Sequence, residues 1–113
     1  FKVVPFDVDK AADYPELIHS EIAAMREQTD GVVVFCDLLG GTPFNQAMMA
    51  SQTTPDVEIV VGANLPMLIE TLFARSSDAN ATIGSLVETA VNAGKNGVDT
   101  RKFEVCADDE DDE

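Results

Sequence analysis

A short apolar run in the first third of the chain constrains the fold most. The residues from Val32 to Cys36 follow Gly31 and are apolar at every position. A strand with one face in water would alternate apolar and polar residues, so this run indicates a strand covered on both faces, as in a parallel sheet. A second, mostly apolar run, residues 57–61, follows a helical segment of about ten residues that begins near Pro43. The sequence therefore predicts a strand–helix–strand unit with a right-handed crossover.

Further elements are expected on both sides of this unit. The opening residues are apolar enough for a strand, which Pro5 would confine to a sheet edge. The expected elements are an opening strand at residues 3–6, helices at about 13–28, 66–74 and 83–93, and a short last strand at 102–105. This order predicts an α/β domain with a small open, mostly parallel sheet and helices on both faces.

The first of these helices carries recognisable start signals. Asp13 can cap it, and Pro15 suits its first turn. Glu21 is expected at the rim of its buried face, and His19, the only histidine in the chain, is expected on the opposite, solvated face. The apolar face itself is expected to hold Tyr14, Leu17, Ile18, Ile22 and Met25. A surface role for His19 follows from this placement.

Length and charge limit the domain count and the partners. A chain of 113 residues is enough for one core. We assign residues 1–106 to a single domain and residues 107–113 to an acidic, solvated tail. The net charge of −14 argues against nucleic acid or an anionic membrane as a partner and favours a partner with a basic face.

Membrane and redox signals are weak in this sequence. Its apolar runs are too short to cross a bilayer, and its first residues do not resemble a secretory signal, so a cytoplasmic protein is expected. The two cysteines, Cys36 and Cys106, lie far apart and lack metal-site spacing, which favours reduced thiols and no metal.

The segment that connects the first apolar run to the next helix carries the strongest functional signal. Asp37 lies where the strand ends, at the edge of an open α/β sheet where ligands bind. Gly40 and Gly41 leave the backbone free of side chains, and Thr42 with Pro43 is typical of a helix cap. Backbone N–H groups at such a helix start can bind a phosphoryl group. A tight turn that merely starts a helix is the alternative explanation, and the spacing matches neither a Rossmann nor a P-loop nucleotide motif.

A second loop repeats this arrangement after the next strand. Residues 62–67 again place a glycine, an asparagine and a proline ahead of a helix. Both loops should open at the same edge of the sheet. Asn64, Pro66 and Met67 are therefore candidates for the site or for a docking loop, although the same residues suit an ordinary strand end and helix start.

Together the two loops resemble those of a known family. Residues 37–45 are similar to the Asp-x-x-Gly-Gly-[Ser/Thr]-Pro-x-Asn motif of the mannose-family enzyme IIA domains of the bacterial sugar phosphotransferase system. Residues 62–72 are similar to that family's following loop and helix. The resemblance covers residues 1 to about 100, and only the acidic end lies outside it.

The resemblance implies a cytoplasmic phosphoryl carrier without a cofactor. In the family, a histidine receives phosphate from the phosphocarrier HPr and passes it to a IIB domain, which phosphorylates the sugar during uptake. That histidine follows a central first strand, which would precede Phe1, so the chain as given lacks it and should be inactive. By position, Asp37 would orient the histidine, and Gly40, Gly41 and Thr42 would bind the phosphoryl group.

Two other functions remain open at this point, along with the role of the neighbouring apolar residues. The chain could be a histidine-free anion-binding or regulatory module, or the related phosphoryl-transfer subunit of a dihydroxyacetone kinase. Leu38 and Leu39 would supply apolar surface to the site or to a docking partner.

The end of the chain suggests self-association. Residues 102–105 alternate polar and apolar side chains, as in an edge strand. The resembling family forms dimers through a swapped C-terminal strand, so we expect a homodimer whose contact includes Phe103 and Val105. Folding of these two residues back onto their own sheet is the alternative.

Overall fold

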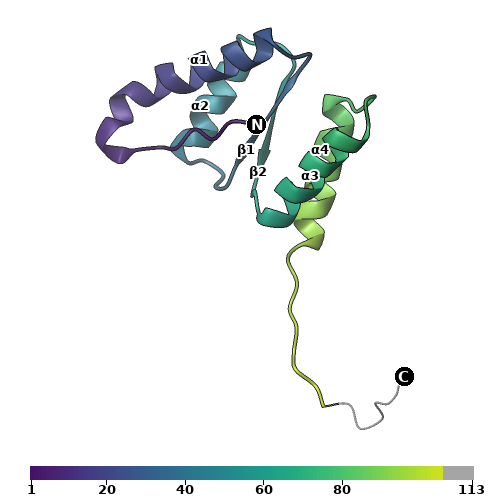
Figure 1. Ribbon diagram of the computed structural model, residues 1–113. Helices are drawn as coiled ribbons and strands as arrows, with labels where there is room; N and C mark the ends of the chain where they lie inside the picture. Colours follow the sequence, from purple (N-terminus) through teal and green to yellow (C-terminus); the bar gives the residue numbers. More distant parts are fainter. Residues whose placement is uncertain (106–113) are drawn as a thin grey trace.

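Two short parallel strands form the centre of the structure (Figure 1). This computed structural model describes residues 1–105, so Cys106 and the expected acidic tail at 107–113 lie outside the described part. The elements are a 3-10 helix η1 (Val8–Asp13), helices α1 (Tyr14–Glu27), α2 (Thr42–Ser51), α3 (Leu65–Ser77) and α4 (Ile83–Asn96), and strands β1 (Val32–Cys36) and β2 (Val57–Val61).

The predicted strand–helix–strand unit is confirmed. Strands β1 and β2 pair in parallel, with Val32 opposite Val57 and Cys36 opposite Val61. Helices α1 and α2 pack together on one side of the strands, and α3 and α4 pack together on the other (Figure 1). The fold is therefore an α/β open sheet with helices on both faces, as the sequence predicted.

The two outer strands expected from the sequence are absent from residues 1–105. Residues 3–6 are irregular, although Val4 and Phe6 pack against the core beneath α1. Residues 102–105 are exposed and extend away from the body of the molecule (Figure 1). A strand needs a neighbour about 4.8 Å away to bond its backbone, and neither segment lies against one in this part of the chain.

The start of α1 differs from the expectation in its cap. Asp13 occupies the N-cap position, but its side chain makes no capping bond and its backbone is already helical (φ −90°, ψ −11°). The reason is that η1 runs directly into α1, so the extended backbone that a capping side chain requires is never reached. Asp7 instead accepts the N–H of Asp9 and caps η1. The end of the helix, Glu27, agrees with the prediction.

Most of the expected apolar face of α1 is buried. Tyr14, Ile18 and Ile22 join the larger core cluster, and the ring of Phe6 meets that of Tyr14 edge to face with centroids 4.9 Å apart. The prediction that Leu17 belongs to this buried face was wrong, because Leu17 lies at the edge of the apolar face and is 41% exposed. Glu21 is at the rim, as expected, and pairs with Lys2 at 3.4 Å.

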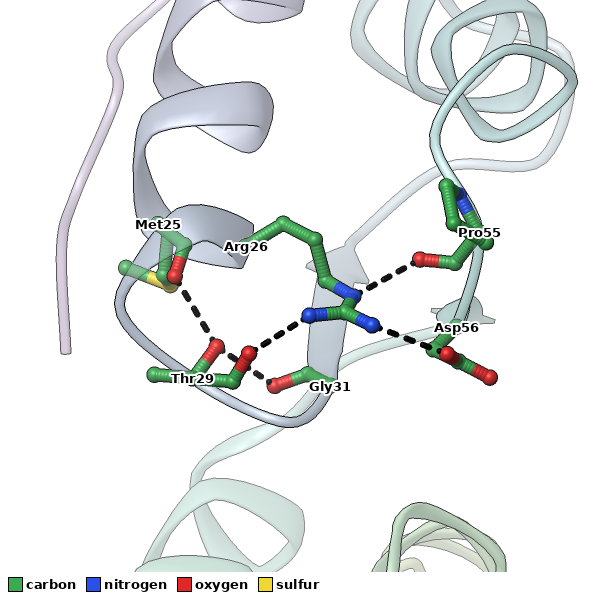
Figure 2. Close-up of polar contacts among 6 residues, drawn as sticks. All are labelled: Met25, Arg26, Thr29, Gly31, Pro55 and Asp56. Atoms are coloured by element: carbon green, nitrogen blue, oxygen red, sulfur yellow. Dashed lines mark hydrogen bonds and ion pairs between the residues drawn. The ribbon is translucent and has the colours of Figure 1, made fainter.

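Arg26 connects the end of α1 to the loop before β2 (Figure 2). Its Nε donates to the carbonyl of Pro55 at 3.0 Å, its Nη1 to the carbonyl of Thr29 at 2.6 Å, and its Nη2 to the carboxylate of Asp56 at 2.9 Å. Asp56 has a positive φ of 59°, and its carbonyl accepts the N–H of Val32 at 3.0 Å. These bonds fix the amino ends of both strands, at the opposite end of the sheet from the loops that follow β1 and β2.

Glycines allow α4 to approach α3 closely. Helix α4 does not stop before Gly94, as the sequence suggested, but continues to Asn96, because Gly94 is buried within the helix against Met67. Gly97 ends it, and a Cβ there would lie 2.6 Å from the ring of Pro66. The last turn of α4 is therefore fitted against the first turn of α3.

Replacing Gly97 with Ala should destabilise the fold by about 1–2 kcal/mol, because the rigid proline ring cannot yield to the new methyl group. The matched control is Gly84→Ala in the same helix, where the nearest atom to a new Cβ is 3.8 Å away. That substitution should be neutral or stabilising by up to about 1 kcal/mol. Urea unfolding followed by circular dichroism measures both, and equal effects would contradict the close approach.

Candidate functional site

Asp37 lies directly after β1, in an exposed loop at the carboxyl end of the sheet. Leu38 and Leu39 follow it with 67% and 70% of their surface exposed. The loop thus places a carboxylate and two bare apolar side chains at the sheet edge, where the sequence predicted them. None of these three side chains is held in the core.

The next residues form the start of α2. Gly40 has a φ of 81°, a conformation that favours glycine. The N-cap is Gly41, in an extended conformation, and not Thr42 as expected, because the backbone of Thr42 is already in the helix. The hydroxyl of Thr42 is therefore not used as a cap. The N–H of Gly41 donates to the carbonyl of Leu38 at 3.3 Å, which closes the turn.

This arrangement leaves polar groups at the helix start available to a ligand. The N–H groups of Thr42 and Phe44 lie in the first turn, where no intrahelical acceptor exists, and Pro43 has no N–H. They point out of the positive end of the α2 dipole. The helix start, with the exposed Thr42 hydroxyl and Asp37 in the same loop, can bind an oxyanion beside a carboxylate.

Sequence reasoning did not assign a role to Asn45, which holds this loop. Its Nδ2 donates to the carbonyl of Gly40 at 3.1 Å, and its own N–H donates to the carbonyl of Gly41 at 2.9 Å. The signal was its position in the first turn of α2, from which an amide side chain can reach back to the preceding loop. Asn45 thus stabilises the left-handed conformation of Gly40.

The loop after β2 has a different role from the one after β1. Asn64 caps α3 by accepting the N–H of Met67 at 3.1 Å, and its Nδ2 donates to the carbonyl of Gly94 at 3.0 Å. Met67 is buried, and Pro66 packs against Gly97. These three side chains hold α3 against α4. This favours the explanation that the loop after β2 simply ends a strand and starts a helix.

The two loops are nevertheless linked at the sheet edge. The N–H of Ala63 donates to the carbonyl of Cys36 at 3.0 Å, so the backbone after β2 is bonded to the last residue of β1. Gly62, with a φ of 83°, makes the turn that permits this bond. The Asn64 cap therefore supports the position of Asp37 indirectly, through the end of β1.

Cys36 lies buried immediately before Asp37. Burial raises the pKa of its thiol, and the negative charge of Asp37 raises it further. Burial also raises the pKa of the Tyr14 phenol, with a smaller contribution from Cys36. Both groups are therefore neutral at physiological pH, and Cys36 is part of the core and not a reactive thiol.

His19 does not belong to this loop. It lies in the middle of α1 and is half-buried, whereas the sequence predicted that it would lie on the solvated face of the helix. The difference arises because α1 lies between the η1 turn and α2, which partly cover its flanks. Within residues 1–105, no group of three or more histidine, cysteine or acidic side chains could hold a metal ion.

A groove runs along the side of β1 that does not face β2. Its volume is about 470 Å³, and it extends from the opening residues 1–4 across β1 to α3. Its walls are mainly apolar, and Asp37 lies at its lining. Because of this groove, Val33, Val34 and Phe35 are only half-buried, although their run of apolar side chains indicated a strand covered on both faces.

The fold and the site define a class of protein: an open α/β domain with an open helix start beside a carboxylate at the carboxyl end of its sheet. Comparison with known proteins assigns its family. The family model described as "PTS system fructose IIA component" (EIIA-man) matches residues 5–91. The chain belongs to this enzyme IIA family of the phosphotransferase system.

Individual relatives agree with this assignment. The chain is 37% identical over 87 residues to the "PTS system mannose-specific EIIAB component" of Escherichia coli (strain K12), covering 77% of this chain and 26% of that protein. It thus spans about a quarter of the length of the curated relatives it matches. Among the helices within residues 1–105, none is long and apolar enough to cross a membrane.

Solved structures share the fold. The mannose/sorbose specific IIA subunit from Enterococcus faecalis is 30% identical with a TM-score of 0.66, covering 86% of this chain and 72% of that one. The phosphotransferase component EIIA from Streptococcus agalactiae is 25% identical with the same TM-score of 0.66, covering 76% and 66%.

Because the pKa of Cys36 is raised in the folded state, the free energy of unfolding should decrease in the alkaline pH range. The thiol of the unfolded chain ionises at about pH 8.5, and the pKa of the folded thiol is higher. The contribution of the neutral thiol to the free energy of unfolding is therefore fully present below about pH 8.5, and it is lost as the pH rises through the folded pKa. Urea unfolding free energies should fall more steeply between about pH 8.5 and 10 in the wild type than in Cys36→Ala. Parallel curves for the two proteins would show that Cys36 ionises normally in the folded state.

Proposed function

We propose that this protein is a phosphoryl carrier that takes phosphate from HPr and passes it to a IIB domain during sugar uptake, in the cytoplasm. The observation that carries the proposal is the loop after β1, which presents Asp37 beside the open start of α2 at Gly41 and Thr42. Membership of the enzyme IIA family supports it. The overall negative charge favours basic partner surfaces.

The phosphate-accepting residue is the histidine of a segment that precedes Phe1 in the full-length protein. Within the described residues, His19 is the only histidine and lies inside α1, away from an anion-binding loop. The groove beside β1 supports the proposal, because a parallel strand placed in it would end next to Asp37. A loop after that strand would bring its side chains to the start of α2. The domain then comprises this preceding strand together with residues 1–106.

Each residue of the loop has a definite task in the transfer. The Asp37 carboxylate accepts a hydrogen bond from one ring N–H of the histidine, so that the other nitrogen carries a free electron pair. This nitrogen attacks phosphorus in line as the bond between phosphorus and the donor's ring nitrogen breaks. The amides of Thr42 and Phe44 and the Thr42 hydroxyl donate to the phosphoryl oxygens and stabilise their charge. Gly40 and Gly41 leave room for the group.

The exposed pair Leu38 and Leu39 provides apolar docking surface at the same edge. Both side chains lie within the loop that holds Asp37, so a partner that reaches the phosphoryl group must contact them. Asn64, Pro66 and Met67 act behind this surface by fixing α3. The alternatives, a histidine-free binding module or a dihydroxyacetone kinase subunit, are less well supported, because the relatives found are sugar phosphotransferase components.

Phosphorylation of the full-length protein tests the proposal. Incubation with phosphoenolpyruvate, enzyme I and HPr should add one acid-labile phosphate, whereas the 113-residue chain should take up none. Asp37→Asn in the full-length protein should slow transfer by about 10- to 100-fold, the cost typical of removing a carboxylate that orients a metal-bound histidine, without unfolding it.

The control is Asp30→Asn, which removes an exposed carboxylate at the opposite end of β1 and should transfer at the native rate. Phosphate on His19, mapped by mass spectrometry, would contradict the proposal. Equal rates for both variants would remove Asp37 from the mechanism.

We further propose a homodimer formed through the extended C-terminal segment. Phe103 and Val105 are 88% and 84% exposed, and the outer edge of β2 has no partner strand within residues 1–105. A strand exchanged between two copies of the chain would bury these two side chains and would pair with the free edge of β2. Sedimentation should show that removal of residues 100–113 from the full-length protein converts a dimer to a monomer. A monomer before and after truncation would overturn this assembly.

A further inference from the structure

Helix α2 has a face without charge that begins at the candidate site. Its residues, Thr42–Ser51, include no acidic or basic side chain, although 25% of the chain is charged. Ala47 is fully buried and marks the side that faces the core. At about 100° per residue, Thr42 and Met49 both lie on the opposite side, and Met48 lies on the flank between them and Ala47. The outer face of α2 therefore carries two methionines in place of charged residues.

The four methionines of the chain differ widely in exposure. Met49 is 54% exposed and Met48 is 44% exposed. Met67 is 3% exposed and packs against Gly94, and Met25 is half-buried near the end of α1. Methionine is flexible and polarisable, and it is enriched where one protein surface docks on another. The exposed pair on α2 is thus set apart from the methionine that builds the core.

A partner that reaches the start of α2 must also cover these two methionines. The helix rises about 1.5 Å per residue, so Met49 lies about 10 Å along it from Thr42. A stable interface buries about 800 Å² on each partner, which corresponds to a patch of about 16 Å radius. A patch centred on the helix start therefore includes Met48, Met49 and the exposed side chains of Leu38 and Leu39.

Exposed thioethers are oxidised by peroxides. The sulfur attacks one oxygen of hydrogen peroxide, the S–O bond forms as the O–O bond breaks, and the other oxygen leaves as water. The sulfur loses two electrons, and an apolar side chain becomes a polar sulfoxide. Cys36 is a poor competitor, because it is buried as a neutral thiol and the thiolate is the reactive form.

Oxidation of the exposed pair changes the surface and not the core. A sulfoxide at Met48 or Met49 stays in water in the free protein, so the fold needs no rearrangement. In a docked complex, the sulfoxide oxygen loses its water and gains no hydrogen bond from an apolar partner surface, which costs free energy. The effect of oxidation therefore falls on the docked state.

We propose that Met48 and Met49 form a peroxide-modification site, at which conversion to the sulfoxide weakens docking of the phosphoryl donor and leaves the fold intact. The inference rests on the proposed function for the identity of that donor, HPr. The chemistry of the modification is independent of it. Because sulfoxides are reduced enzymatically, the change is reversible.

Peptide mapping by mass spectrometry measures the modification itself. After treatment of the full-length protein with hydrogen peroxide, Met48 and Met49 should each gain one oxygen at least about 10-fold faster than Met67, in line with their exposure. The urea midpoint of the oxidised protein should change by less than about 0.3 M. Equal oxidation rates for the exposed and the buried methionines, or unfolding on treatment, would contradict the proposal.

Calorimetric titration with unphosphorylated HPr measures the docking. The treated protein, incubated afterwards with dithiothreitol to restore its thiols, should bind HPr with a Kd at least about 5-fold higher. Methionine sulfoxide reductases should return the Kd to its starting value. In the phosphate uptake assay, the KM for HPr should rise while kcat is unchanged.

A pair of leucine variants provides the matched control. The double variant Met48→Leu, Met49→Leu has no thioether on α2, so its Kd should be the same before and after peroxide. Met25→Leu removes a methionine from another helix and should leave the peroxide response as large as in the wild type. An equal response of the double variant and the wild type would place the sensitive group elsewhere.

Two further outcomes overturn the inference. An unchanged Kd after complete oxidation of Met48 and Met49 would show that HPr does not cover the outer face of α2. Loss of a dimer on oxidation, seen by sedimentation, would assign this face to a second copy of the chain.

Phosphate uptake on the same samples separates this inference from the proposed function. A wild type that accepts no phosphate but binds HPr with an oxidation-dependent Kd would reject the proposed function and keep the modification site. Normal uptake with a Kd that oxidation does not change would do the reverse. Absence of HPr binding and of phosphate uptake before any treatment would reject both.

Discussion

The parallel pairing of β1 with β2 is the interaction on which the rest of the structure depends. The backbone of an apolar strand carries polar groups that must be bonded once the side chains are buried. Pairing in parallel satisfies one edge of β1 and brings the carboxyl ends of both strands to the same end of the sheet. The bond from Ala63 to Cys36 then holds the two following loops together. The candidate site exists because of this arrangement, and Arg26 secures the opposite end.

The two loops show how similar sequences acquire different tasks. Each places a glycine with positive φ after a strand and a proline in the first turn of a helix. After β2, the side chain of Asn64 fills the capping position and bonds to α4, so the helix start is closed. After β1, the capping residue is Gly41, which has no side chain to fill that place. The start of α2 therefore stays open for an anion, and the difference rests on one side chain.

The side of β1 that does not face β2 is left partly exposed to solvent. The groove beside β1 has a volume of about 470 Å³ and lies along a strand that is apolar on both faces. Helix α3, which borders this groove, also exposes apolar side chains on its outer side. Apolar surface left in water favours association with whatever can cover it, at roughly 25 cal/mol per Å². Asp37 lines this groove, so a segment that covers β1 would lie next to the loop that follows the strand.

The sequence by itself determined the elements whose signals are local. The apolar run of β1, the glycines before α2 and the periodicity of α1 predicted the α/β class and the loop of Asp37. The tertiary structure decided whatever depended on a distant partner. Residues 3–6 and 102–105 have strand-like sequences but no adjacent strand to pair with, and Gly94 continues a helix because Met67 packs against it. The N-cap of α2 is Gly41 and not Thr42. Asp13 is the N-cap of α1, but its side chain makes no capping hydrogen bond. In both cases the cap depends on backbone dihedral angles that the neighbouring turns impose.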